Sequence, residues 1–107
     1  MRRKIIAIDF DGTIVTNKFP DIGEPISETT KALLVEIARG SRLILWTCRS
    51  GKLLQDALDW CRENEIVFEA VNENLPDIIE AFGSDTRKIF ANQYWDDKAV
   101  AMPQQKS

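Results

Sequence analysis

The sequence contains no histidine. This absence excludes Ser-His-Asp and Cys-His catalysis, phosphohistidine chemistry and almost every kind of zinc site, because each of these needs an imidazole. There are only two cysteines, Cys48 and Cys61. Two thiols do not make a disulfide framework, and both are expected to be buried as small apolar side chains. Any chemistry must therefore use carboxylates, hydroxyls, lysine and arginine.

Long apolar runs and an excess of basic residues are also missing. No stretch approaches the ~18 apolar residues that span a bilayer, and the apolar run after residues 1–4 is too short for a signal peptide. The chain has 14 basic and 17 acidic residues, a net charge of −3, and no basic stripe of the kind that binds nucleic acid. We therefore expect a cytoplasmic protein that binds neither a membrane nor nucleic acid.

The sequence does contain enough apolar residues for one folded domain. Hydrophobic residues make up 44% of the 107 residues, and three Trp and five Phe argue against disorder. A chain of this length supports one core and not two. We expect a single domain over residues 1–107, with its core at about 3–98 and a flexible polar tail at about 101–107.

Apolar patterning predicts alternating strands and helices. The expected strands are Lys4–Phe10, Arg42–Thr47, Ile66–Val71 and Gln93–Trp95. The expected helices are one capped by Ser27 that ends at Gly40 and buries Leu33, Leu34, Ile37 and Ala38, one from Ser50 to about Asn64, and one over Pro76–Phe82. All three tryptophans are expected in the core. This order predicts an α/β fold, with a small parallel sheet of about four strands whose carboxyl ends share one edge.

Charged and hydroxyl residues follow three of the four expected strands. The run DFDGT (residues 9–13) ends the first strand, Thr47-Cys48-Arg49 ends the second, and Asp96-Asp97 ends the last. Alternation along a strand puts Asp9 and Asp11 on the same side and turns the residue between them into the core. The glycine that follows permits a tight turn, whose N–H groups are suited to hold phosphate oxygens.

Four carboxylates are thus expected at one edge of the sheet: Asp9, Asp11, Asp96 and Asp97. Each like-charged pair at ~4 Å costs roughly 4 kcal/mol at an effective dielectric of about 20. A hard divalent cation relieves this repulsion, and a site of oxygen ligands and waters suits Mg²⁺. The sequence therefore predicts a magnesium site, and a bound magnesium ion attracts phosphoryl oxygens.

These motifs resemble, in their order and strand placement, those of the haloacid dehalogenase (HAD) superfamily. DFDGT looks like the first motif, DxDxT, in its phosphatase form. Thr47 matches the second motif, Lys88 is similar to the basic third motif, and Asp96-Asp97 resembles the acidic fourth. The resemblance covers residues 4 to about 98. It implies a HAD-like Rossmannoid three-layer sandwich without a cap domain.

The resemblance also implies an activity, that of a Mg²⁺-dependent phosphate-monoester hydrolase. Asp9 would attack phosphorus and form an aspartyl-phosphate, and Asp11 would serve as general acid and then base. Thr47 would hydrogen-bond the phosphoryl group, and Lys88 would neutralise its charge and orient Asp9.

The resemblance implies a ligand set as well. Mg²⁺ would take the Asp9 carboxylate, the Asp11 backbone carbonyl and one of Asp96 and Asp97, with Asp96 preferred.

Several assignments stay open at this point. Lys52 and Lys98 also lie near strand ends and are alternatives to Lys88 as the basic residue. Gly12 and Thr47 are expected to bind the substrate phosphate. Arg49 is expected either to join them or to pair with a surface carboxylate.

Two other functions compete with hydrolysis. One is a catalytically weak or silent HAD-like binding module, and the other is a phospho-accepting receiver domain. A receiver carries its acidic pair on the first strand and its acceptor Asp on the third, an order that this sequence does not have. For a hydrolase, the expected substrate is a small phosphate ester or a phosphoprotein. We also expect a homodimer in which the flap, Thr16–Glu24, lies near the partner.

Overall fold

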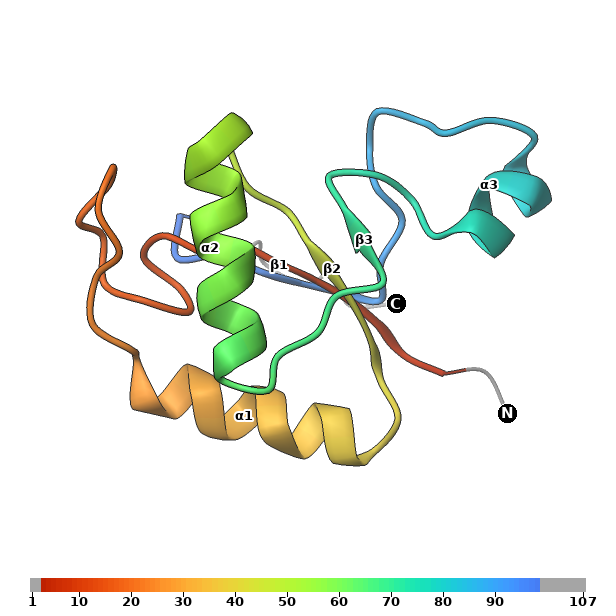
Figure 1. The fold of residues 1–107 in the computed structure, drawn as a ribbon. Coiled ribbons are helices and arrows are strands. Elements are labelled where there is room, and N and C mark those ends of the chain that lie inside the picture. The colour runs from red at the N-terminus through yellow and green to blue at the C-terminus, as the bar shows by residue number, and fades with distance from the viewer. Residues whose placement is uncertain (1–2, 99–107) are drawn as a thin grey trace, which may run out of the picture.

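The structure is a computed structural model that describes residues 3–98, so the predicted tail at 101–107 lies outside the described residues. Within them, four parallel strands form a sheet in the order β3-β2-β1-β4 (Figure 1). The strands are β1 (Ile5–Ile8), β2 (Arg42–Leu45), β3 (Ala70–Val71) and β4 (Gln93–Trp95). The helices are α1 (Ser27–Ala38), α2 (Gly51–Glu63) and α3 (Pro76–Phe82). The predicted α/β fold with a small parallel sheet is confirmed.

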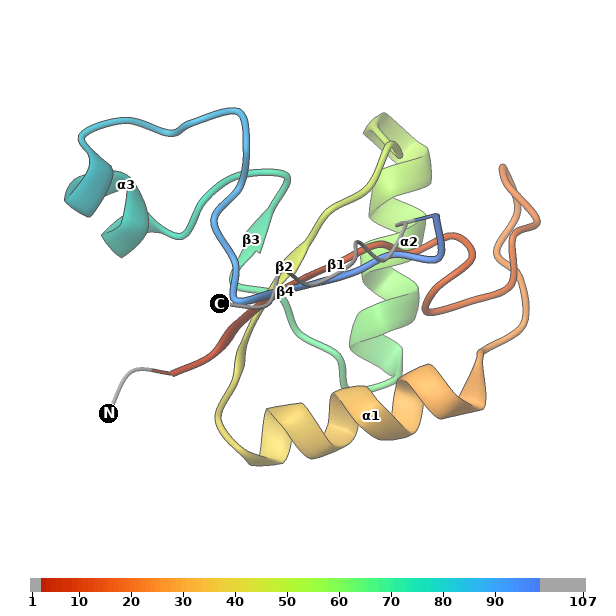
Figure 2. The same ribbon diagram turned by 180° about the vertical axis from the view of Figure 1, so that it is seen from behind.

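Helices cover both faces of the sheet, which gives three layers. One face carries α1 and α2, whose buried residues Leu33 and Cys61 join the larger of two core clusters. The other face carries α3 and the segment after it, where Ile78 and Ile89 join the smaller cluster. Figures 1 and 2 show α1 and α2 together, with α3 set apart from them.

The central position of β1 explains why its sequence is apolar throughout. Ile8 is paired with Leu45 of β2 on one side and with Trp95 of β4 on the other, and all four residues of β1 are buried. A strand covered on both faces needs apolar side chains at every position. Since β1, β2 and β4 are parallel neighbours, the polar residues that follow them meet at one edge.

The third strand is shorter than predicted, because β3 contains only Ala70–Val71 instead of Ile66–Val71. It is an edge strand that pairs only with Ile44 and Leu45, the last two residues of β2. Val67, which the prediction placed inside the strand, is exposed. The apolar run therefore reflects a segment that approaches the sheet, and only its end joins the hydrogen-bonded ladder.

Helix α1 begins and ends close to the predicted positions, but its details differ. Its N-cap is Ile26 without a side-chain cap, so Ser27 is the first helical residue and does not cap the helix. Leu34, predicted to be buried, is 42% exposed, whereas Glu36 is buried. The Glu36 carboxylate accepts hydrogen bonds from Ser41 Oγ at 2.8 Å and Lys4 Nζ at 3.1 Å. Partners from outside the helix thus make the burial of this charge tolerable.

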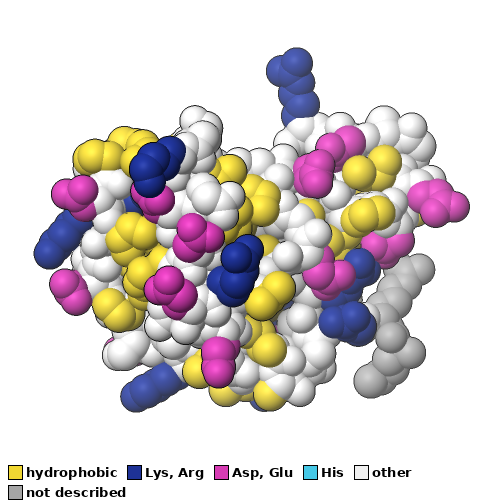
Figure 3. All heavy atoms as spheres, viewed as in Figure 1, with side chains coloured by type: hydrophobic (Ala, Val, Ile, Leu, Met, Phe, Trp, Pro, Cys, Tyr) yellow, Lys and Arg dark blue, Asp and Glu magenta, His cyan; other side chains and the backbone are white. Residues whose placement is uncertain are grey.

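Nothing the size of a cap domain interrupts the fold in residues 3–98. The segment between β1 and α1 is a loop that contains the flap, and the segment between β3 and β4 holds only α3 and its connections. None of the helices described here is long and apolar enough to cross a membrane. On the face shown in Figure 3, basic and acidic side chains are interspersed and form no patch of one sign.

Candidate active site

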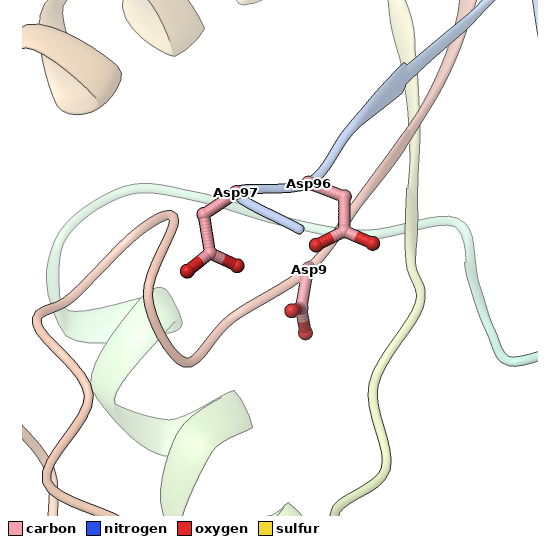
Figure 4. A group of neighbouring side chains, drawn as sticks. All are labelled: Asp9, Asp96 and Asp97. Carbon is pink, nitrogen blue, oxygen red and sulfur yellow. The ribbon is translucent and has the colours of Figure 1, made fainter. Parts of the chain in front are cut away.

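Three carboxylates meet at the carboxyl-terminal edge of the sheet. Asp9 directly follows β1, and Asp96 and Asp97 directly follow the neighbouring β4. The Asp9 N–H donates to the Trp95 carbonyl at 2.9 Å, which extends the ladder to this point. One carboxylate oxygen from each aspartate lies within 4.8 Å of the others (Figure 4). The structure therefore brings together three of the four predicted metal-binding residues.

The carboxylate of Asp9 carries an uncompensated charge. Partial burial, together with the smaller effect of the nearby charges of Asp96, Asp11 and Asp97, raises the pKa of Asp9 to about 6, while a hydrogen bond from the Phe10 N–H at 2.8 Å opposes the rise. Among residues 3–98, none of the three clustered carboxylates forms an ion pair. A set of oxygen donors that repel one another fits a hard divalent cation such as Mg²⁺.

The turn after Asp9 packs directly against Asp97. Gly12 has a φ of +86°, and a Cβ added there would lie 2.5 Å from Oδ2 of Asp97, so the position needs glycine. The Asp97 N–H donates to Thr13 Oγ1 at 3.2 Å. Sequence reasoning gave Thr13 no role of its own, although it is the final residue of DFDGT. The first and fourth motifs are thus held together by contacts that involve both residues of this turn.

The predicted role of Gly12 as a phosphate donor is wrong for this arrangement. Its N–H donates to the Val15 carbonyl at 2.7 Å and is therefore not free for a phosphate oxygen. The next N–H in the turn, that of Thr13, donates to the Phe10 carbonyl at 3.3 Å. What Gly12 provides is the space that Asp97 occupies.

Thr47 lies at the same edge of the sheet, two residues after the end of β2. Its backbone is held by Asn72, whose Oδ1 accepts from the Thr47 N–H at 2.8 Å and whose Nδ2 donates to the Thr47 carbonyl at 2.9 Å. Asn72 has a φ of +54°, which a residue that closes a turn can adopt. Its position directly after β3 is the one signal that the sequence offers for this role. Asn72 fixes Thr47 in place.

Arg49 is buried, with 2% of its surface exposed, and both predictions for it are wrong. Its Nε and Nη2 donate to the two oxygens of Asp11 at 2.8 and 2.7 Å. Its remaining N–H groups donate to the backbone carbonyls of Asp21 at 2.8 Å, Pro20 at 3.2 Å and Leu53 at 3.3 Å. These five bonds use all five donors of a guanidinium. No donor is left for a substrate phosphate, and the partner carboxylate is not a surface one.

The carboxylate of Asp11 is correspondingly absent from the acidic cluster. Both of its oxygens accept from Arg49, and its side chain is 16% exposed. The prediction that the Asp11 backbone carbonyl is a metal ligand is untested and stays a prediction. The carboxylates of Asp9 and Asp11, expected on one side of the strand, therefore have different neighbours. Asp9 lies with Asp96 and Asp97, whereas Asp11 binds Arg49.

Of the three lysines considered, Lys52 pairs with Asp56 at 3.1 Å on the exposed side of α2. Lys88 is exposed in the loop between α3 and β4, and its ammonium makes no ion pair within the part of the chain that the structure describes. The side chain of Lys98 also forms no ion pair there, while its backbone N–H donates to Asp96 Oδ1 at 3.0 Å. Lys88 stays the predicted basic residue.

The loop that carries Lys88 is anchored by Asn74, a buried residue that the sequence did not single out. Asn74 Nδ2 donates to Asp85 Oδ1 at 2.9 Å and to the Thr86 carbonyl at 3.2 Å, and its Oδ1 accepts from the Phe90 N–H at 2.7 Å. These contacts lie on both sides of Lys88 in the chain. Asn74 thereby sets the path of the loop from which Lys88 projects.

Two aromatic side chains, those of Trp46 and Tyr94, contact each other near the carboxyl ends of β2 and β4. Trp46 follows Leu45, the partner of Ile8, and is therefore level with Asp9 across the sheet. Trp46 is 39% exposed, so its predicted core position is wrong, and its ring lies 5.5 Å from that of Tyr94. Cys48, also predicted to be buried, is exposed. Both Trp46 and Cys48 lie beyond the end of β2. Alternation along the strand puts Trp46 on the face of Ile44, which belongs to the smaller core cluster on the α3 side.

Comparison with known proteins supports the fold. No family model matches the chain, and no curated protein matches it. A solved structure, that of a conserved protein from Bacteroides thetaiotaomicron, is 38% identical in sequence and has a TM-score of 0.80. The match covers 96% of this chain and 84% of that chain.

Proposed function

We propose that this chain, which belongs to the same family as the conserved protein from Bacteroides thetaiotaomicron, is a Mg²⁺-dependent phosphate-monoester hydrolase. The observation that carries this proposal is the convergence of Asp9, Asp96 and Asp97, none of which forms an ion pair with a basic side chain of residues 3–98. The resemblance of the motifs to the HAD superfamily gives these carboxylates their roles.

Asp9, Asp96 and Asp97 would hold Mg²⁺, and the Asp11 carbonyl would complete the set of protein ligands. When bound, the ion supplies positive charge that offsets the charge on the phosphoryl oxygens. The raised pKa of Asp9 is consistent with this assignment, because burial and then the neighbouring carboxylates disfavour its charged form, which a bound cation would stabilise.

The residues of the chain would carry out two displacements at phosphorus. In the first, a carboxylate oxygen of Asp9 bonds to phosphorus as the bond to the leaving oxygen breaks, and that oxygen takes a proton from Asp11. In the second, a water oxygen bonds to phosphorus, its proton goes to Asp11, and the bond to Asp9 breaks with its electron pair returning to Asp9. The hydroxyl of Thr47, whose backbone Asn72 holds, would donate a hydrogen bond to the phosphoryl group, and Lys88 would balance the charge of that group.

Steady-state hydrolysis of p-nitrophenyl phosphate with and without Mg²⁺ tests the proposal. A hydrolase releases many p-nitrophenolate ions per chain and needs Mg²⁺ to do so. A silent binding module releases none. A receiver-type domain accepts at most one phosphoryl group per chain from a small phosphodonor and then stops.

The substrate class stays a prediction, a small phosphate ester or a phosphoprotein, and a screen of phosphorylated metabolites and phosphopeptides would identify it. The cytoplasmic location and the homodimer also stay predictions. Within the flap, Ile22 packs against the core of its own domain, whereas Phe19 is exposed and available to a partner.

A further inference from the structure

The side chain of Arg49 joins three separate parts of the molecule. It leaves the loop between β2 and α2 and reaches the Asp11 carboxylate, the Leu53 carbonyl in α2, and two carbonyls in the flap, those of Pro20 and Asp21. Its contact with Asp11 is bidentate, with one N–H on each oxygen, the geometry that a planar guanidinium matches best. Arg49 is thus the link between the flap and the expected acid–base residue.

Two aromatic rings complete the surroundings of the guanidinium. Its central carbon lies 5.1 Å from the centroid of the Phe10 ring and 5.2 Å from that of Phe19. Phe10 belongs to the core between Asp9 and Asp11, whereas Phe19 belongs to the flap and is exposed. Both contacts are attractive for a cation, so the flap is held to Arg49 through a ring as well as through its backbone.

This arrangement separates Arg49 from a substrate-binding residue. A phosphate contact needs a free N–H, and all five are used within the protein. Both Asp11 oxygens accept from Arg49, so the direction of this carboxylate depends on the guanidinium. Resting on the proposed function, we infer that Arg49 is the positioning residue for Asp11 and couples its orientation to the position of the flap.

The position that Arg49 gives to Asp11 matters most in the second displacement. There, the attacking water gives its proton to Asp11 while its oxygen bonds to phosphorus, and the bond from phosphorus to Asp9 breaks. The carboxylate must face the water for this transfer to occur. Lysine at position 49 keeps the charge but offers three donors on a single atom, which cannot reproduce a bidentate contact and three carbonyl contacts together. The Arg49→Lys variant should therefore lose the orientation of Asp11.

Three variants test the inference with p-nitrophenyl phosphate and Mg²⁺: Arg49→Lys, Asp11→Asn and the double variant. We expect kcat to fall by ~10²–10⁴ in Asp11→Asn, the usual value of general acid–base catalysis. Arg49→Lys should lower kcat at least ~10-fold with KM nearly unchanged, and the double variant should match Asp11→Asn, because Arg49 acts through Asp11. The matched control is Arg42→Lys, an arginine that pairs with Glu69 and Asp77 at the opposite edge, and its kcat should stay at the wild-type value.

Two kinetic outcomes overturn the inference. If Arg49→Lys raises KM and leaves kcat unchanged, Arg49 contacts substrate. If the losses of the single variants multiply in the double variant, Arg49 acts independently of Asp11. In both cases the wild type still turns over and the proposed function stands. A wild type without Mg²⁺-dependent turnover overturns the proposed function, and the positioning role with it.

If Arg49→Lys does not fold, a stability measurement decides. Asp11→Asn leaves the buried guanidinium of Arg49 without its counter-charge, whereas Asp9→Asn removes a charge from a group of carboxylates that repel one another. In EDTA, the Tm of Asp11→Asn should therefore fall below that of the wild type, and the Tm of Asp9→Asn should not. An Asp11→Asn variant as stable as the wild type would show that Arg49 does not hold Asp11 and would overturn the inference.

Discussion

The two edges of the sheet differ in whether their clustered carboxylates form ion pairs. At the amino-terminal edge, Arg42 pairs with Glu69 at 3.2 Å and with Asp77 at 2.9 Å. The hydrogen bond from Arg42 lowers the pKa of Asp77. At the carboxyl-terminal edge, Asp9 lies with Asp96 and Asp97, none of the three forms an ion pair within residues 3–98, and burial is the main cause that raises the pKa of Asp9 to about 6. Charges at the first edge are balanced by Arg42, whereas the charges at the second edge are those that Mg²⁺ would balance under the proposed function.

Glu36 extends the same contrast. It lies near the amino-terminal edge, where hydrogen bonds from Ser41 and then Lys4 lower its pKa. A buried carboxylate that serves the fold is therefore supplied with partners. Asp9, in contrast, has the Phe10 N–H as its hydrogen-bond donor and three carboxylates nearby. This difference is the one that the proposed metal site requires at the carboxyl-terminal edge.

Removing the central carboxylate should have the largest effect. Asp9→Asn keeps the volume of the side chain and removes the nucleophile, so Mg²⁺-dependent hydrolysis of p-nitrophenyl phosphate should fall by at least ~10³-fold. Circular dichroism should show that the fold survives. Activity within about tenfold of the wild type would contradict the assigned role of Asp9.

Asp96→Ala should change metal binding and stability in opposite directions. In EDTA the variant should melt several degrees above the wild type, because one of three repelling carboxylates is gone. With Mg²⁺ added, it should gain less stability than the wild type and bind the ion more weakly. Thermal melts with and without Mg²⁺ measure both effects. If EDTA leaves the wild-type Tm unchanged and Asp96→Ala melts lower, Asp96 is a structural residue.

The pH dependence of stability should carry the signature of Asp9. The pKa of this group is raised from 3.8 to about 6 in the folded protein, so the folded state binds the proton more tightly than the unfolded state. Its contribution to stability is fully present below pH 3.8 and is lost as the pH rises through about 6. In EDTA, the Tm of the wild type relative to that of Asp9→Asn should fall across this window, and the stabilisation by Mg²⁺ should grow. A constant difference between the two proteins would contradict this account.

The opposite edge should give the smallest effect. Arg42→Ala removes the partner of Glu69 and Asp77, and both carboxylates are well exposed. Exposed ion pairs contribute little and are screened by salt. The Tm should fall by a few degrees at low ionic strength and by less at high salt, with hydrolysis unchanged. A loss of hydrolysis in this variant would show that the two edges are not independent.

The acidic cluster was predictable because it depends on local rules. The apolar run of β1 and the short strand Gln93–Trp95 are each followed directly by aspartates, and parallel neighbours bring such residues to one edge. Position alone was enough to place Asp9, Asp96, Asp97 and Thr47 there.

The contacts that orient these residues were not predictable in the same way. The partners of Arg49 come from the flap, from α2 and from Asp11, which lies 38 residues away in the chain, so the path of the flap decides them. Asn72 and Asn74 act through single amide groups that no periodic pattern marks. Glu36 is buried only because Lys4 and Ser41 reach it. Polar burial of this kind depends on the tertiary structure.

The central claim is that Asp9 accepts the phosphoryl group, and the most direct test is to find that group on Asp9. The wild type would be quenched with acid during turnover of p-nitrophenyl phosphate with Mg²⁺, digested and analysed by mass spectrometry. We expect one phosphoryl group on the peptide that contains Asp9. It should be absent from Asp9→Asn and from the wild type without Mg²⁺, and more abundant in Asp11→Asn, which is slow to hydrolyse it. A phosphoryl group on another residue, or turnover that persists in Asp9→Asn, would contradict the account.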